Sequence, residues 1–216
     1  MRVIEKFVSI NGEGLRSGEL AVFIRFANCN LRCSYCDTKY SFINPVYTEE
    51  SIDEIVSFIV STGVTNVTLT GGEPLIQDDI KELMLKLAKL NKRIEIETNG
   101  SVNISPFLNI PNVTFTLDYK LKGSGMEKYM DLTNYDFLRK NDVIKFVVSD
   151  YDDLCKTKEI IEKYQLVSKA NCLISPVWGR IEFEDIVNFM KENKLNDVKL
   201  QLQIHKIIWD KDKRGV

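Results

Sequence analysis

Apolar residues in this chain follow two spacings that alternate from one end of the sequence to the other. In short runs they occupy every second position or follow one another directly, which is typical of half-buried and fully buried β-strands. These runs predict strands at 2–10, 20–27, 66–70, 93–98, 112–120, 142–149, 171–177 and 198–205. In longer segments they recur every three or four residues, which predicts helices at 44–63, 76–90, 150–165 and 182–194.

The alternation of strands and helices predicts the fold class. A strand followed by a helix and another strand favours right-handed crossovers and a mostly parallel sheet in an α/β protein. About six or seven such strands are compatible with a curved, partly open barrel and with a doubly wound sheet. A chain of 216 residues can bury a full core, so we expect one domain spanning 1–216.

Polar and glycine-containing motifs follow several predicted strands directly. Because the carboxyl ends of parallel strands lie on one face of a sheet, we expect the functional groups to gather there. The motifs are TGGEP at 70–74, TNGS at 98–101, DYK at 118–120 and SPVWG at 175–179, together with His205 and the cysteine-rich loop after the strand at 20–27.

Composition and charge narrow the class of partner. The chain is 44% hydrophobic and 28% charged, with 29 basic and 31 acidic residues. This balance provides no basic field for nucleic acid, so we expect a small-molecule substrate and no nucleic acid partner. The start of the chain lacks a signal-peptide pattern, and no apolar run reaches membrane-spanning length. We therefore expect a cytoplasmic protein with no membrane partner.

Three of the five cysteines, Cys29, Cys33 and Cys36, lie within eight consecutive residues in the spacing C-x3-C-x2-C. In a reducing compartment such crowding indicates metal ligands or redox groups rather than a disulfide framework. A structural zinc site requires a fourth ligand, and the only histidine, His205, is a distant candidate. An iron–sulfur cluster held by three thiolates instead leaves one iron open to a chelating molecule.

The cysteine loop and the TGGEP motif together resemble the radical S-adenosylmethionine superfamily. Gly71, Gly72 and Glu73 match its GGE element, and Tyr35 matches an aromatic residue that contacts adenine. The resemblance implies a [4Fe-4S] cluster whose open iron is chelated by S-adenosylmethionine. It also implies reductive cleavage of this cofactor to a 5′-deoxyadenosyl radical, with the electron supplied by an external one-electron reductant.

Motifs along the whole chain are similar, in the same order, to those of the 7-carboxy-7-deazaguanine synthase family. They are INGEG, AVFIRFANCNLRCSYCDT, TGGEP, IEIETNGS, DYK, SPVWG and LQLQIHKIIW. The resemblance implies a partial (β/α) barrel of the radical S-adenosylmethionine type with the cluster loop after an N-terminal strand. An N-terminal strand extension and a C-terminal segment on the substrate side complete the expected domain.

The same resemblance implies the chemistry. The expected activity is that of a carbon–nitrogen lyase of queuosine and other 7-deazapurine biosynthesis. It contracts the ring of 6-carboxy-5,6,7,8-tetrahydropterin to 7-carboxy-7-deazaguanine and releases ammonia. Magnesium and a homodimer are further expectations from this resemblance.

Matched position by position, the resemblance assigns three sets of site residues and names no catalytic residue beyond the cluster and the cofactor. The metal ligands are Cys29, Cys33 and Cys36 for the [4Fe-4S] cluster and Thr38 for Mg²⁺. The S-adenosylmethionine contacts are Tyr35, Cys36, Asp37, Gly72, Glu73, Asp118, Tyr119, Lys120, Ser175, Pro176, Val177 and Trp178. The substrate contacts are Ile10, Asn11, Gly12, Glu13, Arg25, Thr70 and His205.

Some of these residues carry a signal of their own. Arg25 is the one cation in the apolar run AVFIRFA, so its guanidinium needs a carboxylate from a substrate or from a protein acid. With the pterin substrate that the resemblance implies, the Glu13 carboxylate can accept two parallel hydrogen bonds from the amino face of the pterin. His205 ends a predicted strand on which Gln203 faces the same side, and a purely structural histidine is the alternative.

Two other classes of protein share parts of these motifs. A glycyl-radical activase would share the cysteines and the GGE element but would act on a protein, and we expect it to lack Arg25, Thr38 and the INGEG motif. A zinc-binding interaction module would be no enzyme and would use the three thiolates and His205. That module requires His205 to lie beside the cysteines.

Overall fold

One sheet of nine strands runs through the computed structural model, which describes residues 1–216. The strands are β1 Arg2–Ile10, β2 Leu20–Phe26, β3 Thr48–Glu49, β4 Asn66–Gly71, β5 Arg93–Thr98, β6 Val113–Tyr119, β7 Val143–Val148, β8 Asn171–Pro176 and β9 Val198–Leu200. Their order is β3-β1-β2-β4-β5-β6-β7-β8-β9, so the sheet does not close into a full barrel. Neighbours from β2 to β9 are parallel, whereas β1 pairs antiparallel with β2 and β3.

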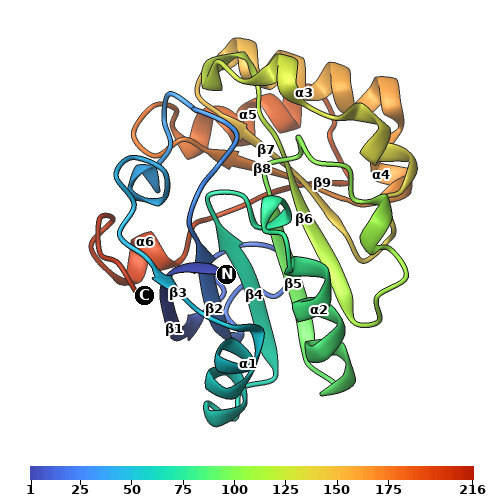
Figure 1. Ribbon diagram of the computed structural model, residues 1–216. Helices are drawn as coiled ribbons and strands as arrows, with labels where there is room; N and C mark the ends of the chain where they lie inside the picture. The colour runs from blue at the N-terminus through green and yellow to red at the C-terminus, as the bar shows by residue number, and fades with distance from the viewer.

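The longer helices lie on the outer side of this curved sheet (Figure 1). The helices are α1 Ile52–Ser61, α2 Ile80–Lys89, α3 Tyr151–Tyr164, α4 Leu166–Lys169, α5 Phe183–Glu192 and α6 His205–Ile208. Short 3-10 helices occur at Lys39–Ser41, Pro74–Ile76, Ser105–Phe107, Lys122–Ser124, Glu127–Tyr129 and Leu132–Asp136. The predicted α/β class with a mostly parallel, partly open barrel is confirmed.

The two faces of the sheet differ in polarity, because successive residues of a strand point to opposite sides. On β5, Ile94 and Ile96 belong to a hydrophobic core of 39 buried residues that also contains residues of α1, α2, α3 and α5. Glu95 and Glu97 alternate with them on the inner side. That inner side also carries the buried polar side chains Thr68, Thr70, Thr116 and Lys145. The fold therefore has an apolar layer under the helices and a polar interior.

The helix predicted at 44–63 begins later than expected. Thr48 and Glu49 pair with the start of β1 as β3, and the helix starts only after Ser51. The Ser51 hydroxyl accepts a hydrogen bond from the Glu54 backbone N–H while the Glu54 carboxylate accepts from the Ser51 N–H. This capping box fixes the first turn of α1, because it satisfies two N–H groups that the helix itself leaves unpaired.

The strand predicted at 198–205 is wrong beyond its third residue. β9 ends at Leu200, and the chain then leaves the sheet, with the Ile204 N–H donating to the Gly12 carbonyl. His205 therefore starts α6 and does not end a strand, so the expected alternation with Gln203 does not apply. No helix in the structure has both the length and the apolar character needed to cross a membrane.

Candidate functional site

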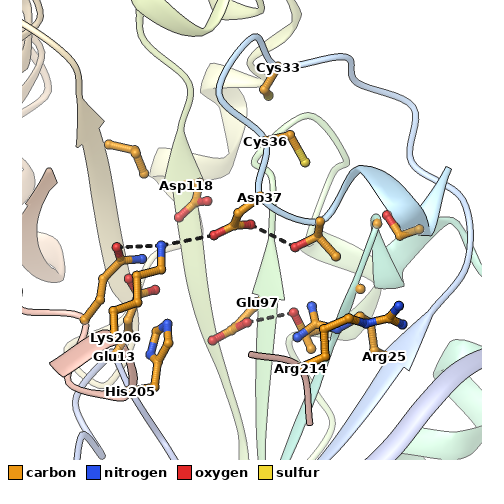
Figure 2. Close-up of a pocket in the computed structure, with 18 of the residues that line it drawn as sticks. Glu13, Arg25, Cys33, Cys36, Asp37, Glu97, Asp118, His205, Lys206 and Arg214 are labelled. Carbon is orange, nitrogen blue, oxygen red and sulfur yellow. Dashed lines mark hydrogen bonds and ion pairs between the residues drawn. The ribbon is translucent and has the colours of Figure 1, made fainter. Parts of the chain in front are cut away.

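The carboxyl ends of the parallel strands open into one cavity of about 740 Å³ on the inner side of the sheet. Residues far apart in the sequence meet in it, with the cysteine loop at one end and His205 and Arg25 at the other (Figure 2). The predicted site residues that line it are Ile10, Gly12, Glu13, Arg25, Cys29, Cys33, Tyr35, Cys36, Asp37, Thr38, Thr70, Gly72, Asp118, Lys120, Ser175, Pro176, Val177, Trp178 and His205.

Asn11, Glu73 and Tyr119 do not line this cavity. Asn11 is buried, accepts a hydrogen bond from the Thr68 hydroxyl at 2.8 Å and bonds through its backbone to Glu19 across the β1–β2 connection. The ring of Tyr119 packs into the core, since it lies on the opposite face of β6 from Asp118. The side chains of these residues belong to the framework of the site.

Glu73 is fully buried behind the cavity and ties two strand ends together. Its carboxylate accepts hydrogen bonds from the Leu75 N–H at 3.0 Å, the Thr98 hydroxyl at 2.8 Å and the Asn99 N–H at 2.7 Å. Burial raises its pKa to about 7, although these donors favour the ionised form. The side chain expected to contact the cofactor therefore holds the loop after β4 to the end of β5.

The loop that carries Cys29, Cys33 and Cys36 presents three free, partly exposed thiols to the cavity. The Cys29 sulfur accepts from the Leu31 N–H at 3.4 Å and from the Asn99 amide at 3.6 Å. Burial raises the pKa of Cys33 and Cys36. Three sulfur donors on one short loop, with N–H groups directed at one of them, suit an iron–sulfur cluster.

The alternative zinc site is not assembled. Zinc–sulfur bonds of about 2.3 Å would bring tetrahedral ligands within about 4 Å of one another. No three histidine, cysteine or acidic side chains lie in such an arrangement. His205 lies across the cavity from Cys33 and Cys36 (Figure 2), so it does not complete a four-ligand set.

Gly71 and Gly72 run directly against the backbone that leads into the cysteine loop. A Cβ atom on Gly72 would lie 1.9 Å from the Asn28 carbonyl oxygen, and one on Gly71 would lie 2.4 Å from that of Phe26. The Gly72 N–H donates to Phe26 and the Glu73 N–H donates to Asn28. The glycines are therefore needed for close contact between two backbone segments of the site.

A chain of alternating charges crosses the middle of the cavity. Lys145 Nζ donates to Glu13 Oε2 at 2.7 Å and lies 3.2 Å from Asp118 Oδ1, while Lys120 Nζ donates to Asp118 Oδ2 at 2.6 Å. Burial opposes the ionised carboxylates, but Lys145 keeps the pKa of Glu13 below its usual range, and both lysines do so for Asp118. Glu13 is thus held by one protein cation, Lys145.

Arg25 has a protein partner. Its Nε donates to Glu5 Oε1 at 2.6 Å, and its side chain is 19% exposed. The sequence left two possible partners for Arg25, a substrate carboxylate or a protein acid. The structure shows that a protein acid, Glu5, is one partner. Beside Arg25, the Thr70 hydroxyl donates to the half-buried Glu97 at 2.7 Å, and desolvation raises the pKa of Glu97 although Lys145 opposes the shift.

His205 and Thr38 are held by neighbouring groups at two sides of the cavity. A Cβ atom on Gly12 would lie 1.9 Å from His205 Nδ1, so the imidazole packs directly on this glycine. Burial lowers the pKa of His205, which favours the neutral ring. The Thr38 hydroxyl donates to Asp37 Oδ1 at 2.8 Å, and Lys206 Nζ lies 3.3 Å from Asp37 Oδ2.

The sequence prediction missed Glu5, Glu97 and Lys145 as cavity residues. Glu97 alternates with isoleucine in the strand RIEIET, and Lys145 is the one charge in VIKFVV. Both patterns place a charge in a run that is otherwise suited to burial, which is the signal that drew attention to Arg25. Glu5 lies in a strand with several charges and has no comparable signal.

Comparison with known proteins assigns these features to a family. Residues 23–116 match the Radical SAM superfamily. Over 100% of its length the chain is 61% identical to 7-carboxy-7-deazaguanine synthase of Clostridium acetobutylicum, in an alignment covering 99% of that protein. The chain belongs to the 7-carboxy-7-deazaguanine synthase family. A family member from Leptospira interrogans is 37% identical, over 99% of this chain and 97% of the relative.

Solved structures give the same fold. QueE from Escherichia coli superposes with a TM-score of 0.71 at 22% identity, over 93% of this chain and 92% of that one. SuiB from Streptococcus suis, bound to its precursor peptide, superposes with a TM-score of 0.58 at 14% identity, over 82% of this chain and 47% of that one. At these identities the likeness concerns the fold alone.

Membership of this family makes the protein a radical S-adenosylmethionine lyase and implies a [4Fe-4S] cluster together with S-adenosylmethionine. The resemblance seen in the sequence is thereby confirmed, and the glycyl-radical activase and the zinc module are excluded. The three-thiol loop suits the [4Fe-4S] cluster, and the cavity beside it suits S-adenosylmethionine.

Proposed function

We propose that this member of the 7-carboxy-7-deazaguanine synthase family contracts 6-carboxy-5,6,7,8-tetrahydropterin to 7-carboxy-7-deazaguanine with loss of ammonia. One observation carries the proposal. A single cavity joins the three-thiol loop to a deep polar end that contains the Arg25 guanidinium, the His205 imidazole and the Glu97 carboxyl group. A cofactor at the loop and a small, polar, carboxylate-bearing substrate at the other end can therefore face each other.

The end near the loop is proposed as the cofactor site. Cys29, Cys33 and Cys36 would hold the [4Fe-4S] cluster. Cluster and S-adenosylmethionine together supply a 5′-deoxyadenosyl radical for hydrogen abstraction. The cavity walls around the loop would bind the cofactor's polar and adenine groups through Tyr35, Asp37, Gly72, Asp118, Lys120 and the segment from Ser175 to Trp178.

The deep end is proposed as the substrate site. Arg25 would pair with the substrate carboxylate, because a guanidinium matches that group in shape and charge. Thr70, Ile10 and Gly12 would contact the pterin edge through hydroxyl and backbone groups. His205, held against Gly12, would donate or accept one hydrogen bond as a neutral imidazole.

Glu97 is proposed as a group that holds or moves a proton during the rearrangement. It is half-buried at the cavity wall, desolvation raises its pKa, and its one hydrogen bond inside the protein comes from Thr70. A carboxyl group with these properties is suited to general acid–base work. Glu13 is less suited to this task, because Lys145 holds it in the ionised form.

Thr38 is proposed as a magnesium ligand. Its hydroxyl and the Asp37 carboxylate lie together at the cavity wall, 2.8 Å apart. Magnesium prefers oxygen ligands and keeps several waters, so one hydroxyl supplemented by water and substrate oxygens is sufficient.

We further propose a single functional domain spanning 1–216, a homodimer and an external one-electron reductant. The continuous core of 39 residues supports a single domain.

The homodimer is supported by exposed apolar side chains. Ile43 and Val46 beside the β3 edge are 55% and 86% exposed, which supports pairing of two copies there. Light scattering on the purified protein tests the dimer. The reductant follows from the chemistry of the cluster.

One assay tests the activity. The cluster is reconstituted without oxygen, and dithionite, S-adenosylmethionine, magnesium and 6-carboxytetrahydropterin are added. The expected product is 7-carboxy-7-deazaguanine, identified by mass. Formation of 5′-deoxyadenosine without this product would be consistent with radical S-adenosylmethionine chemistry but would reject the proposed substrate.

A further inference from the structure

Glu5 on β1 is a partly buried carboxylate to which the proposed function gives no role. It faces Arg25 in the register of β1 and β2, and its Oε1 accepts from Arg25 Nε at 2.6 Å and from the Tyr40 hydroxyl at 3.0 Å. Its Oε2 lies 3.7 Å from an amino group of Arg214. With 17% of its side chain exposed, Glu5 joins two strands, the turn after the cysteine loop and the C-terminal segment.

Arg25 is bound to the protein through Nε alone. Its two terminal amino groups donate to no protein acceptor, and the residue lines the cavity. A guanidinium carries its donors in a rigid planar fork that matches a carboxylate. Glu5 therefore fixes the plane of Arg25 and leaves the terminal amino groups available.

Arg214 fastens the C-terminal segment at the same end of the cavity (Figure 2). Its guanidinium carbon lies 3.7 Å from the centre of the Tyr40 ring, an arrangement typical of a cation–π contact. Residues 211–216 all line the cavity. The other side-chain bonds of this segment are local, between Lys211, Asp212 and Asp210. Arg214 is thus the side chain that ties the segment to the body of the protein.

We propose that Glu5 is a positioning residue for recognition of the substrate carboxylate. It orients Arg25 through Nε, and it anchors the C-terminal segment over the cavity through Arg214. This inference rests on the proposed function, because the carboxylate received by Arg25 is that of the pterin substrate. Glu5 acts through the two arginines and does not itself touch the substrate.

Simple electrostatics predicts the opposite effect of removing Glu5. A negative charge beside Arg25 lowers the local positive potential, so its removal alone would strengthen binding of an anionic substrate. Positioning predicts weaker binding, since Arg25 loses its orientation and the C-terminal segment loses its anchor. The direction of the change in KM therefore separates the two accounts.

The test compares three single variants and one double variant of the reconstituted holoenzyme under dithionite. Glu5→Ala removes both contacts and is expected to raise KM for 6-carboxytetrahydropterin about tenfold or more, the size expected for a charge-assisted hydrogen bond. Glu5→Gln keeps an oxygen for Arg25 and Tyr40 but turns an amide toward Arg214. It is expected to raise KM by the same smaller factor as Arg214→Ala, with no further rise when the two are combined.

The controls distinguish positioning from a loss of structure. Glu49→Gln removes the acid of an exposed ion pair with Arg2 and is expected to leave KM unchanged. Every variant is expected to keep wild-type iron content and wild-type 5′-deoxyadenosine formation in the absence of substrate. Binding of 6-methyltetrahydropterin, which lacks the carboxylate, is expected to be the same in wild type and variants.

An unchanged or lowered KM in Glu5→Ala, with an active wild type, would overturn the inference and leave the proposed function standing. If Glu5→Ala fails to fold, equal KM values for wild type, Glu5→Gln and Arg214→Ala would overturn it instead. A wild-type protein that forms no 7-carboxy-7-deazaguanine would reject the proposed function, and the inference with it.

Discussion

Lys145 and Glu13, which lie 132 residues apart in the chain, form an ion pair of 2.7 Å in the interior of the barrel. The Lys145 side chain is 9% exposed and that of Glu13 is 12% exposed. Asp118 contacts the same ammonium group at 3.2 Å. This lysine therefore compensates two largely desolvated carboxylates, 12% and 16% exposed, that belong to the loop after β1 and to β6.

Replacing Lys145 with methionine should destabilise the protein strongly. The change leaves Glu13 without its partner and Asp118 with Lys120 alone, and an unpaired buried charge typically costs about 3–5 kcal/mol. Denaturant unfolding measures the loss. Lys86→Met, which removes exposed ion pairs with Asp53 and Glu82, is the matched control and should leave the unfolding midpoint nearly unchanged. Equal midpoints for the two variants would contradict the compensating role of Lys145.

Because of Glu95, the free energy of unfolding should fall as the pH rises from about 4.3 to 7. Burial, with the neighbouring Glu97 charge, raises its pKa to about 7. A raised pKa means that the folded state binds more protons than the unfolded state between about pH 4.3 and 7, so unfolding becomes easier across this window. Glu95→Gln keeps an oxygen for the Thr116 hydroxyl, which donates at 2.6 Å, and carries no charge.

The Glu95→Gln variant should therefore gain stability relative to wild type by about 1–3 kcal/mol between pH 5 and 8. Urea unfolding at both pH values measures this difference. A difference between variant and wild type that does not change with pH would show that Glu95 is ionised in the folded protein throughout this range.

Gly72→Ala should prevent assembly of the cofactor end of the cavity. The added methyl group would meet the Asn28 carbonyl oxygen at 1.9 Å, and a backbone oxygen cannot move aside as a flexible side chain can. Iron content after reconstitution and product formation should both fall at least about tenfold. Gly63→Asn, at an open turn with positive φ that asparagine tolerates, is the control and should retain both.

Cys33→Ser should abolish iron binding and activity, whereas Cys155→Ser should leave both unchanged. Cys33 faces the cavity, and Cys155 is exposed on α3. A cluster with three thiolate ligands loses an iron ligand in the first variant only. Iron and sulfide analysis of the two variants measures their cluster content. Full iron content in Cys33→Ser would reject the assignment of this loop.

Thr38→Val should raise the magnesium concentration needed for half-maximal activity. Valine has nearly the shape of threonine but lacks the hydroxyl proposed as a magnesium ligand. A shift of about tenfold is expected for the loss of one ligand group. Formation of 5′-deoxyadenosine without substrate should not change. A magnesium dependence equal to that of wild type would remove Thr38 from the proposed site.

Much of the fold follows from local patterns in the sequence. The predicted strands at 2–10 and 93–98 agree with β1 and β5 to the residue. The first is a run rich in β-branched and apolar residues, the second alternates strictly, and both are followed by turn residues, so the local signal and the tertiary structure agree. The motifs at strand ends also gather as expected, because parallel topology brings the carboxyl ends of strands together.

Other features needed the tertiary structure. The apolar alternation that predicted a strand to His205 stops pairing at Leu200, although β8 continues to Pro176, because the chain turns away to the β1–β2 connection, where the Ile204 N–H donates to the Gly12 carbonyl. Glu73 stands in a motif suited to cofactor contact, yet its carboxylate turns to the end of β5. Periodicity reports that a position is buried, but it does not identify the neighbouring group.

The sequence by itself determined the family, the three-thiol loop and the need for a carboxylate near Arg25, because these depend on residue type and local spacing. The tertiary structure decided the partners. Arg25 meets Glu5 through the register of two antiparallel strands, and Lys145 meets Glu13 across the barrel. Such pairings depend on how distant strands are aligned, which no local pattern specifies.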